Sequence, residues 1–354
     1  MYSFHLLALQ PLIASNPAQA LHHASGAIQH VGEKPFLTFL TNQGLAPLWH
    51  ETLITTNTLS LFSPAFIGEL QQISLHTTAE YLKQQHSLSR INDTLNTQSI
   101  PYALFKGAHI RELIYENPAV RSSCDIDILV AKKDKVSAIK ALVAAGFTFR
   151  PNPENISHEA PLTDGKTSLD LHWDILRPGR TRVDLTDEFL HTRQQRDGYW
   201  HLDCNTTLFI LLVHPVFTKY STTDHASLIR LVDLQRWQRT QSIDWKKVLD
   251  YLERGGVKTA AWITAVFLNM LTGETLPEPF MQSIRPGTAR SWYLRQWLKR
   301  NLATGLLEYP LLVQIGFTLA AHDTVTDALL FTRQLLKEKK QAARQTEELL
   351  RRID

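Results

Sequence analysis

The segment "DIDILV", from Asp125 to Val130, constrains the fold more than any other part of the chain. Its apolar residues predict a short buried strand. Side chains two positions apart on a strand point to the same face, so Asp125 and Asp127 must project together. Two neighbouring carboxylates in a partly apolar setting are costly unless a cation bridges them. The segment therefore predicts a strand that binds a hard divalent ion, most often Mg²⁺, through oxygen ligands.

A second strand-like segment, "SLDLHWDI" at residues 168–175, carries a third acid, Asp170, between two leucines. Two acids on one strand and one on a neighbouring strand are the minimum set for two metals about 3.5–4 Å apart, which clamp the attacking and leaving oxygens of a phosphoryl displacement. We expect Asp125 and Asp127 to hold both ions. Asp170 is expected to hold the catalytic ion and to help deprotonate the acceptor.

Other interpretations remain open for this second segment. Asp174 lies further along it and could replace Asp170, which we favour because apolar residues flank it. His172 could be a ligand or a base, or a histidine whose hydrogen bonds are satisfied beside Trp173. Each acid alone could be a surface residue, because charged residues are mostly exposed. The hypothesis therefore rests on the acids together.

The Lys106-Gly107 pair stands where the apolar run "IPYALF" is expected to end as a strand and a helix to begin. Glycine allows close backbone approach, and the first N–H groups of a helix can bind a phosphate. Lys106 adds a positive charge, although a lysine at a strand end often just reaches solvent. Arg121 could neutralise a phosphate or orient an aspartate through a bidentate contact.

Hydrophobic periodicity divides the chain into three regions. Residues 1–98 are expected to be helical, and most of residues 64–98 to form one long amphipathic helix. Residues 99–204 alternate between strand and helix patterns and predict a small α/β unit, with a hairpin turn at "TDGKT". Residues 205–354 return to helices, one of which is expected to begin at Asp244 as its N-cap. The charged C-terminal segment is expected to be a solvated helix.

Composition and charge limit the classes of protein. Lys and Arg total 37 and Asp and Glu 34, a mildly basic balance that demands no nucleic-acid partner. The two cysteines, Cys124 and Cys204, are too few for a disulfide framework and favour a reducing compartment. We expect Cys124 to be a small buried residue.

The sequence predicts neither a cleaved leader nor a membrane span. The N-terminal apolar run lacks a basic region before it, and His5, Gln10 and Pro11 interrupt it. No stretch reaches the roughly 18 uninterrupted apolar residues that a spanning helix needs. We therefore expect a soluble, cytoplasmic protein.

The combined motif resembles the polymerase-β-like nucleotidyltransferase superfamily, and most closely an uncharacterised bacterial branch of it. The similarity extends over about residues 100–256, with vaguer similarity in the N-terminal helices and little beyond Leu276. Its strand of apolar-Asp-apolar-His-Trp form matches Leu169 to Trp173. The residues that carry the first part of the motif are Lys106, Gly107, Tyr115, Arg121, Asp125, Ile126 and Asp127. Downstream positions that the resemblance singles out for the acceptor or for support of the site are His172, His214, Lys219 and Asp233.

This resemblance implies an α+β fold, with a small mixed-sheet core flanked by N-terminal and C-terminal helical regions. It implies transfer of a nucleoside monophosphate (NMP) from a nucleoside triphosphate (NTP) with release of pyrophosphate, dependent on Mg²⁺ or Mn²⁺. The residues that would bind the nucleotide are Lys106, Gly107, Ala108 and Arg121. Better-known members have Gly-Ser or Gly-Gly in this turn, whereas Ala108 here offers the triphosphate no hydroxyl.

Three interpretations of function follow. The favoured one is an NMP transferase acting on a protein, a peptide or a small molecule, although the residues do not distinguish NMP transfer from phosphoryl transfer. The second is a binding or regulatory module with a degenerate site, which Ala108 favours and the retained acids oppose. The third is nucleic-acid modification, which the near-neutral charge disfavours, because affinity for a phosphate backbone depends on clustered Lys and Arg.

Overall fold

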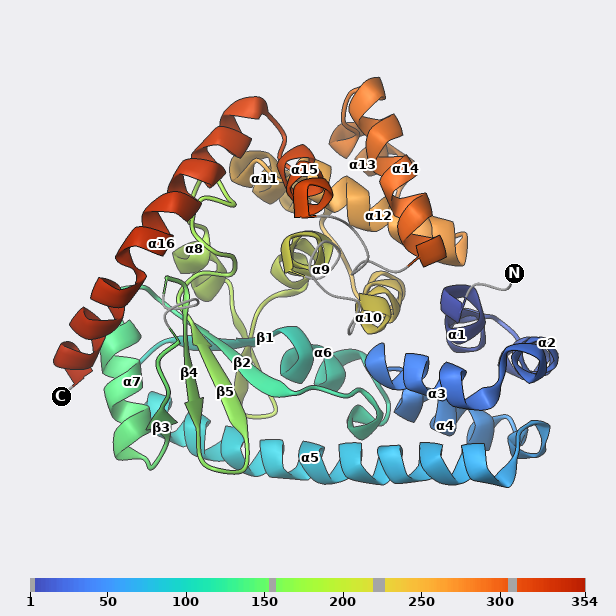
Figure 1. Cartoon of the computed structure of the whole chain (residues 1–354). Helices are drawn as coiled ribbons and strands as arrows, with labels where there is room; N and C mark the ends of the chain where they lie inside the picture. The colour runs from blue at the N-terminus through green and yellow to red at the C-terminus, as the bar shows by residue number, and fades with distance from the viewer. Residues whose placement is uncertain (1–3, 153–156, 219–226, 305–310, 354) are drawn as a thin grey trace.

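The computed structural model describes residues 4–152, 157–218, 227–304 and 311–353. The N-terminal region is helical, as predicted. Helix α5 is the predicted long helix, and the hydroxyl of its N-cap Ser63 accepts a hydrogen bond from the backbone N–H of Phe66 at 3.2 Å. It extends beneath both the N-terminal helices and the sheet (Figure 1). The five helices are α1 (Phe4–Ile13), α2 (Pro17–Val31), α3 (Glu33–Asn42), α4 (Ala46–Thr55) and α5 (Pro64–Thr97).

A mixed seven-stranded sheet follows, so the predicted α+β class is confirmed. The strand order is β3-β4-β5-β2-β1-β7-β6, with β2 parallel to β5, β1 parallel to β7 and the other neighbours antiparallel. The strands are β1 (Tyr102–Phe105), β2 (Asp125–Val130), β3 (Thr148–Phe149), β4 (Glu159–Thr163), β5 (Ser168–His172), β6 (Gln194–Arg196) and β7 (Tyr199–His201).

The sequence analysis did not anticipate the edge hairpin β6–β7. Its strands have three residues each, and every residue of β6 is exposed, so no apolar alternation marks them. Its turn is formed by Asp197 and Gly198, which both have positive φ (50° and 86°), as the preferred two-residue hairpin turn requires.

The two faces of the sheet pack against different helices. Leu104, Ile126 and Ile128 belong to a hydrophobic cluster with α5 and α7 (Lys135–Ala144). Phe105 and Leu129 point the other way, into a larger cluster with the C-terminal helices. Figure 1 shows the strands between α5 below and the C-terminal helices above. The predicted acids lie on this second face, together with Phe105.

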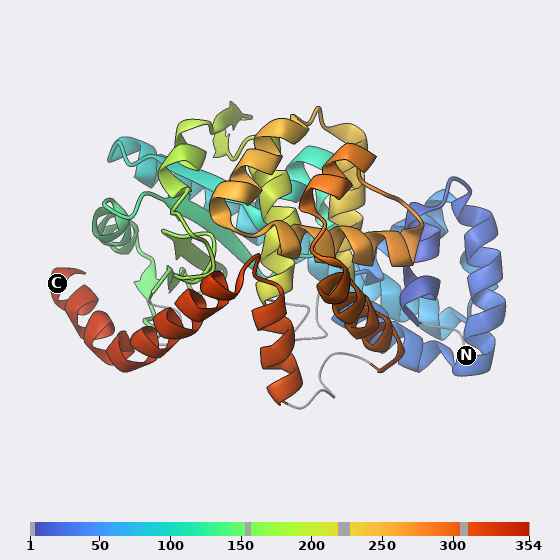
Figure 2. The same cartoon turned by 90° about the horizontal axis from the view of Figure 1, so that it is seen from above.

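The C-terminal helices stack over the sheet (Figure 2). The predicted N-cap at Asp244 is confirmed, since its carboxylate accepts hydrogen bonds from the N–H groups of Lys246 and Lys247. The short helix α6 (Lys106–Ile114) follows β1 and precedes β2 in the chain. The remaining helices are α8 (Thr186–His191), α9 (Cys204–Thr218), α10 (Ser227–Thr240), α11 (Trp245–Gly255), α12 (Lys258–Thr272), α13 (Glu278–Ile284), α14 (Thr288–Thr304), α15 (Leu311–Ala320) and α16 (Val325–Ile353).

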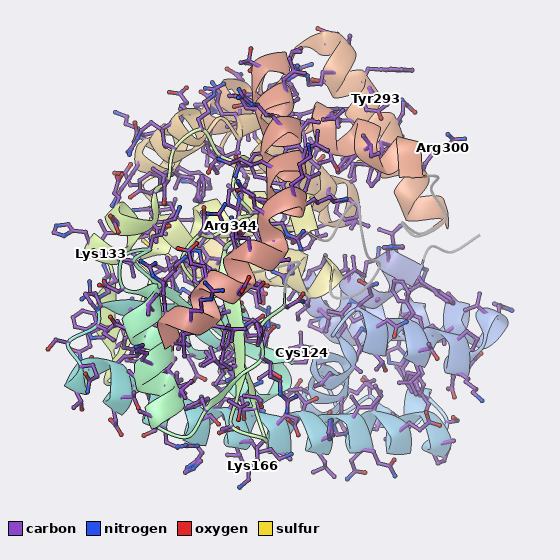
Figure 3. All side chains as sticks on the ribbon, turned by 60° about the vertical axis from the view of Figure 1, so that its left-hand side comes forward. Cys124, Lys133, Lys166, Tyr293, Arg300 and Arg344 are labelled. Atoms are coloured by element: carbon purple, nitrogen blue, oxygen red, sulfur yellow. The ribbon has the colours of Figure 1, made fainter. Side chains whose placement is uncertain are left out.

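Helix α16 is mostly exposed, but it runs back to the core, where Leu349 is buried in the cluster beside α7. Cys124, just before β2, is exposed, so its predicted burial is wrong. Figure 3 labels it between the sheet and the N-terminal helices. In the described part of the chain, no helix combines the length and the apolarity that crossing a bilayer requires.

Candidate active site

Asp127 and Asp170 are direct neighbours in the sheet. They are paired across the parallel strands β2 and β5, and Phe105 pairs with Asp127 on its other side. Asp125 pairs with Ser168 on the same ladder, so its side chain points to the same face two residues away. The structure thus places the three predicted acids on one face, where all of them line one cavity, but the set whose ligand atoms lie within 4.8 Å of one another is Asp127, Asp170 and His172, without Asp125. Asp174 lies beyond the end of β5 and does not line the cavity described below.

Burial and charge separate the two paired carboxyl groups. Burial, followed by the charges of Asp127, Asp125 and Glu159, raises the pKa of Asp170 to about 8. Burial also opposes ionisation of Asp127, but Lys106 and His172 outweigh it and hold the pKa of the Asp127 carboxyl well below its usual range. Lys106 and His172 therefore favour the ionised form of Asp127, whereas burial and neighbouring carboxylates favour the protonated form of Asp170 when no cation lies between the two.

Lys106 is the partner that compensates Asp127. Its Nζ lies 2.7 Å from Asp127 Oδ1 and 3.2 Å from His172 Nε2, and His172 Nε2 lies 3.0 Å from the same oxygen. The backbone of Lys106 has φ = +54°, a left-handed conformation that is unusual for a lysine. Backbone strain of this kind is concentrated at functional sites. The predicted place for Lys106, at the turn from strand to helix beside the acids, is the observed one.

Gly107 is needed for close packing. A Cβ at this position would lie 2.5 Å from Arg121 Nη1 and would also collide with the side chain of Ser123. Ala108 is fully buried in the hydrophobic cluster beneath α6 and does not line the cavity. A hydroxyl at position 108 would therefore point into the core and not into the cavity.

Arg121 does not lie next to the three acids as a free cation. Its Nη2 lies 2.6 Å from Asp233 Oδ2 on α10, and its Nη1 donates to the carbonyl of Ser122 at 2.8 Å. The hydroxyl of Tyr115 donates to Asp233 Oδ1 at 2.7 Å. Arg121 contacts an aspartate through two nitrogens, as one of its two predicted roles required. That aspartate is Asp233, which is fully buried and does not line the cavity.

A cavity of about 320 Å³ lies over the acids, between the sheet and the helices. His214 on α9 lines it, as the resemblance implied, while Lys219 lies outside the described residues. Four Lys and Arg side chains line the same cavity, and three of them, Arg177, Arg180 and Arg230, were not predicted from the sequence. The lining residues are Lys106, Asp125, Asp127, His158, Glu159, Asp170, His172, Ile175, Leu176, Arg177, Arg180, His214, Thr218 and Arg230.

Arg180 and Arg230 are basic residues with unmet hydrogen-bonding capacity. The Nε atom of each is buried without a hydrogen-bond partner among the described residues. Burial lowers the pKa of both, that of Arg180 to about 10. A signal for Arg230 was present in the sequence, because it precedes the singled-out Asp233 by three residues and so lies near it on the helix surface.

The fold and the site define an α+β protein in which acids on a mixed sheet share one cavity with arginines from a loop and from helix α10. A family model described as an uncharacterised nucleotidyltransferase matches residues 29–273, so the chain belongs to this nucleotidyltransferase family. The match begins in α2 and ends just after α12, a longer span than the predicted residues 100–256. No curated protein and no solved structure matches the chain significantly.

Proposed function

We propose that the protein is a metal-dependent nucleotidyltransferase that moves an NMP group from an NTP to a hydroxyl or similar nucleophile of a protein, a peptide or a small molecule. In this reaction the acceptor oxygen bonds to the α-phosphorus, the bond from that phosphorus to the β-phosphate bridging oxygen breaks, and pyrophosphate leaves. The family membership supports the general class of reaction.

The observation that carries the proposal is the opposition of charges across one cavity. Asp127 and Asp170 lie side by side on the sheet, while Arg180 and Arg230 line the same cavity with buried, unpaired Nε atoms. Arginines bind phosphate oxygens in planar, bidentate geometry. Acids that bind a cation, facing arginines that bind phosphates, fit a metal-bound triphosphate and fit an uncharged ligand poorly.

The donor groups of the sheet fit a hard divalent ion. Burial, followed by the charge of Asp127, raises the pKa of Asp170 to about 8, and a cation between the two carboxylates would relieve both penalties. Asp125, Asp127 and Asp170 would hold Mg²⁺ or Mn²⁺, which prefer carboxylate oxygens. When bound, the ion would neutralise the negative charges of the carboxylates and of the phosphates.

The side chains of the chain would perform the remaining tasks. Arg180 and Arg230 would bind and orient the triphosphate, and Lys106, whose Nζ reaches Asp127, would hold that carboxylate in position. The carboxylate of Asp170 would accept the proton that the acceptor loses. The helical layer over the sheet would exclude water from the cavity, because water is the competing acceptor.

Labelled nucleotides test this proposal. The full chain is incubated with Mg²⁺ and NTP labelled at the α- or the γ-phosphorus, with candidate acceptors and with no acceptor, so that self-modification is also detected. We expect only the α-label to become covalently attached. Asp127→Asn and Asp170→Asn should each lower the rate at least about 100-fold, because the ligands of a catalytic ion contribute several kcal/mol to the barrier. Asp187→Asn, an exposed acid on α8, is the matched control.

Each alternative has its own result. Transfer of the γ-label would replace NMP transfer with phosphoryl transfer. Calorimetry that detects no binding at millimolar Mg²⁺-NTP would favour the inert binding module. Unchanged transfer in Asp127→Asn would refute the metal site, whatever the label.

A further inference from the structure

A second cluster of metal-binding side chains lies next to the three acids. His158 and Glu159 stand at the start of β4, and His172 stands at the end of β5. Glu159 and His172 are paired across the antiparallel strands β4 and β5, so both side chains lie on the face that carries Asp170. All three residues are buried, and all three line the cavity.

The distances in this cluster match those between ligands of one ion. Glu159 Oε2 lies 3.3 Å from His158 Nε2 and 3.2 Å from His172 Nδ1, and the three ligand atoms lie within 4.8 Å of one another. Ligand atoms about 2.0–2.2 Å from a tetrahedral Zn²⁺ are about 3.3 Å apart. The cluster therefore needs little rearrangement to hold such an ion.

His172 Nδ1 provides an independent observation. This side chain is 1% exposed, and its Nδ1 has no hydrogen-bond partner among the described residues, although Glu159 Oε2 is only 3.2 Å away. A buried, unsatisfied nitrogen is costly. A cation bound between Nδ1 and the carboxylate would satisfy Nδ1, because Glu159 Oε2 already has His158 Nε2 as a partner at 3.3 Å.

The contacts of the other ring nitrogen of His172, Nε2, also fit a metal bound at Nδ1. Nε2 lies 3.0 Å from Asp127 Oδ1, and Lys106 Nζ approaches both atoms. A histidine that binds a metal usually donates its other ring N–H to a carboxylate, which fixes the ring and its tautomer. Asp127 is placed to be that carboxylate.

We propose that His158, Glu159 and His172 form a binding site for a nitrogen-preferring divalent ion such as Zn²⁺, distinct from the oxygen-only site of the three aspartates. Two imidazoles and one carboxylate suit Zn²⁺, whereas Mg²⁺ selects oxygen ligands. Three protein ligands leave a fourth position open to the cavity, as in catalytic rather than structural zinc sites. The ion would also hold His172 against Asp127, and this binding does not depend on whether the protein transfers nucleotides.

Zn²⁺ binding to the metal-free full chain tests the site. Affinity is measured by competition with a chromophoric chelator, in excess Mg²⁺ so that oxygen-only sites are occupied. We expect one tightly bound Zn²⁺ that Mg²⁺ does not displace. His158→Asn and Glu159→Gln should each weaken binding at least about 10-fold, because even the removal of outer partners has effects of that size. His76→Asn, an exposed histidine on α5, should bind like the wild type.

Asp170→Asn separates the new site from the other possible set, Asp127, Asp170 and His172. Zn²⁺ affinity that survives this change supports the proposal, and affinity lost with it would assign the ion to the aspartates. Equal affinity in the wild type and His158→Asn would overturn the proposal. If the variants do not fold, as judged by circular dichroism, Co²⁺ bound to the wild type decides. Intense visible absorption indicates the expected four-coordinate site, and the weak absorption of an octahedral oxygen site would refute it.

Discussion

Arg121 and Asp233 form a buried ion pair that ties the loop before β2 to helix α10, with 2.6 Å between Nη2 and Oδ2. The hydroxyl of Tyr115 donates to the same carboxylate. Arg230 lies three residues before Asp233 on α10 and lines the cavity over the acids. The pair therefore positions both the strand that carries the acids and the helix that carries an arginine opposite them.

Breaking this pair should destabilise the protein strongly. In Asp233→Ala or Arg121→Met, one buried charge remains without its partner, which typically costs about 3–5 kcal/mol of unfolding free energy. Urea unfolding of both single variants and the double variant measures this, and the double variant should lose less than the sum. Asp250→Asn removes the exposed ion pair with Arg254 and should have no measurable effect. Additive losses in the double variant would show that the two residues act separately.

Gly107→Ala should be destabilising even though it adds only one methyl group. The new Cβ would lie 2.5 Å from Arg121 Nη1, so the loop before β2 must shift, at a cost of about 1–3 kcal/mol. Gly68→Ala in α5 is the matched control, because its Cβ would meet nothing within 4 Å. That change should stabilise the helix by about 0.5–1 kcal/mol. Equal effects in thermal unfolding would contradict the close packing at Gly107.

Ala108→Ser, which adds a hydroxyl directly after Gly107, should not improve nucleotide binding. The side chain of Ala108 is fully buried among apolar residues, so the new hydroxyl would face the core. We expect unchanged affinity for Mg²⁺-NTP by calorimetry and a loss of about 1–3 kcal/mol in unfolding free energy. Tighter NTP binding in the variant would mean that this side chain reaches the substrate.

Local patterns predicted the strands and the acids because period-two alternation depends only on neighbouring residues. The segment "DIDILV" forms β2, and the first five residues of "SLDLHWDI" form β5, which ends at His172, three residues before the end of the predicted segment. The apolar flanks of Asp170 correctly indicated its place inside the sheet. In contrast, Asp174 lies past the strand end. Its pKa is raised to about 7, chiefly by burial, and its carboxylate accepts a hydrogen bond from the N–H of Leu176.

The missed residues depend on tertiary packing. Arg180 reaches the cavity from a loop, and no local pattern distinguishes an arginine that faces a cavity from one that faces water. Arg230 reaches it from α10, and its only signal in the sequence is the spacing of three residues from Asp233. Strand β4 contains Pro161 and follows a polar segment, so no local pattern predicts a strand that begins at Glu159. The sequence indicated that Arg121 could bind a carboxylate in a bidentate manner. The carboxylate that it binds belongs to Asp233, more than a hundred residues away in sequence.

Asp327 makes stability depend on pH. Hydrogen bonds from Arg182, outweighing burial, lower the pKa of Asp327 to about 2. Because the folded pKa is below the unfolded value near 3.9, this stabilisation is fully present above about pH 5 and is lost as pH falls towards 2. Asp327→Asn should therefore lower the urea midpoint at pH 7 and have a shrinking effect between pH 4 and 3. Arg182 is 40% exposed, so the loss at pH 7 should be only about 1 kcal/mol. A pH-independent effect would exclude this linkage.

Arg230 should cost stability and contribute to binding. Among the described residues its Nε has no hydrogen-bond partner, and burial and nearby Arg121 lower the pKa of its guanidinium more than Asp127, Asp233 and Asp125 raise it. Arg230→Gln removes a buried positive charge that its neighbours compensate incompletely, so the unfolding free energy should stay the same or rise. Affinity for Mg²⁺-NTP should fall about 10- to 100-fold, since hydrogen bonds to charged groups contribute about 1.5–3 kcal/mol. The matched control is Arg239→Gln, which changes an exposed arginine on the same helix and should leave the affinity unchanged.

Calorimetry with Mg²⁺-NTP and urea unfolding are carried out on the wild type, Arg230→Gln and Arg239→Gln. If Arg230→Gln weakens folding but not NTP binding, Arg230 is structural and the triphosphate must bind elsewhere in the cavity.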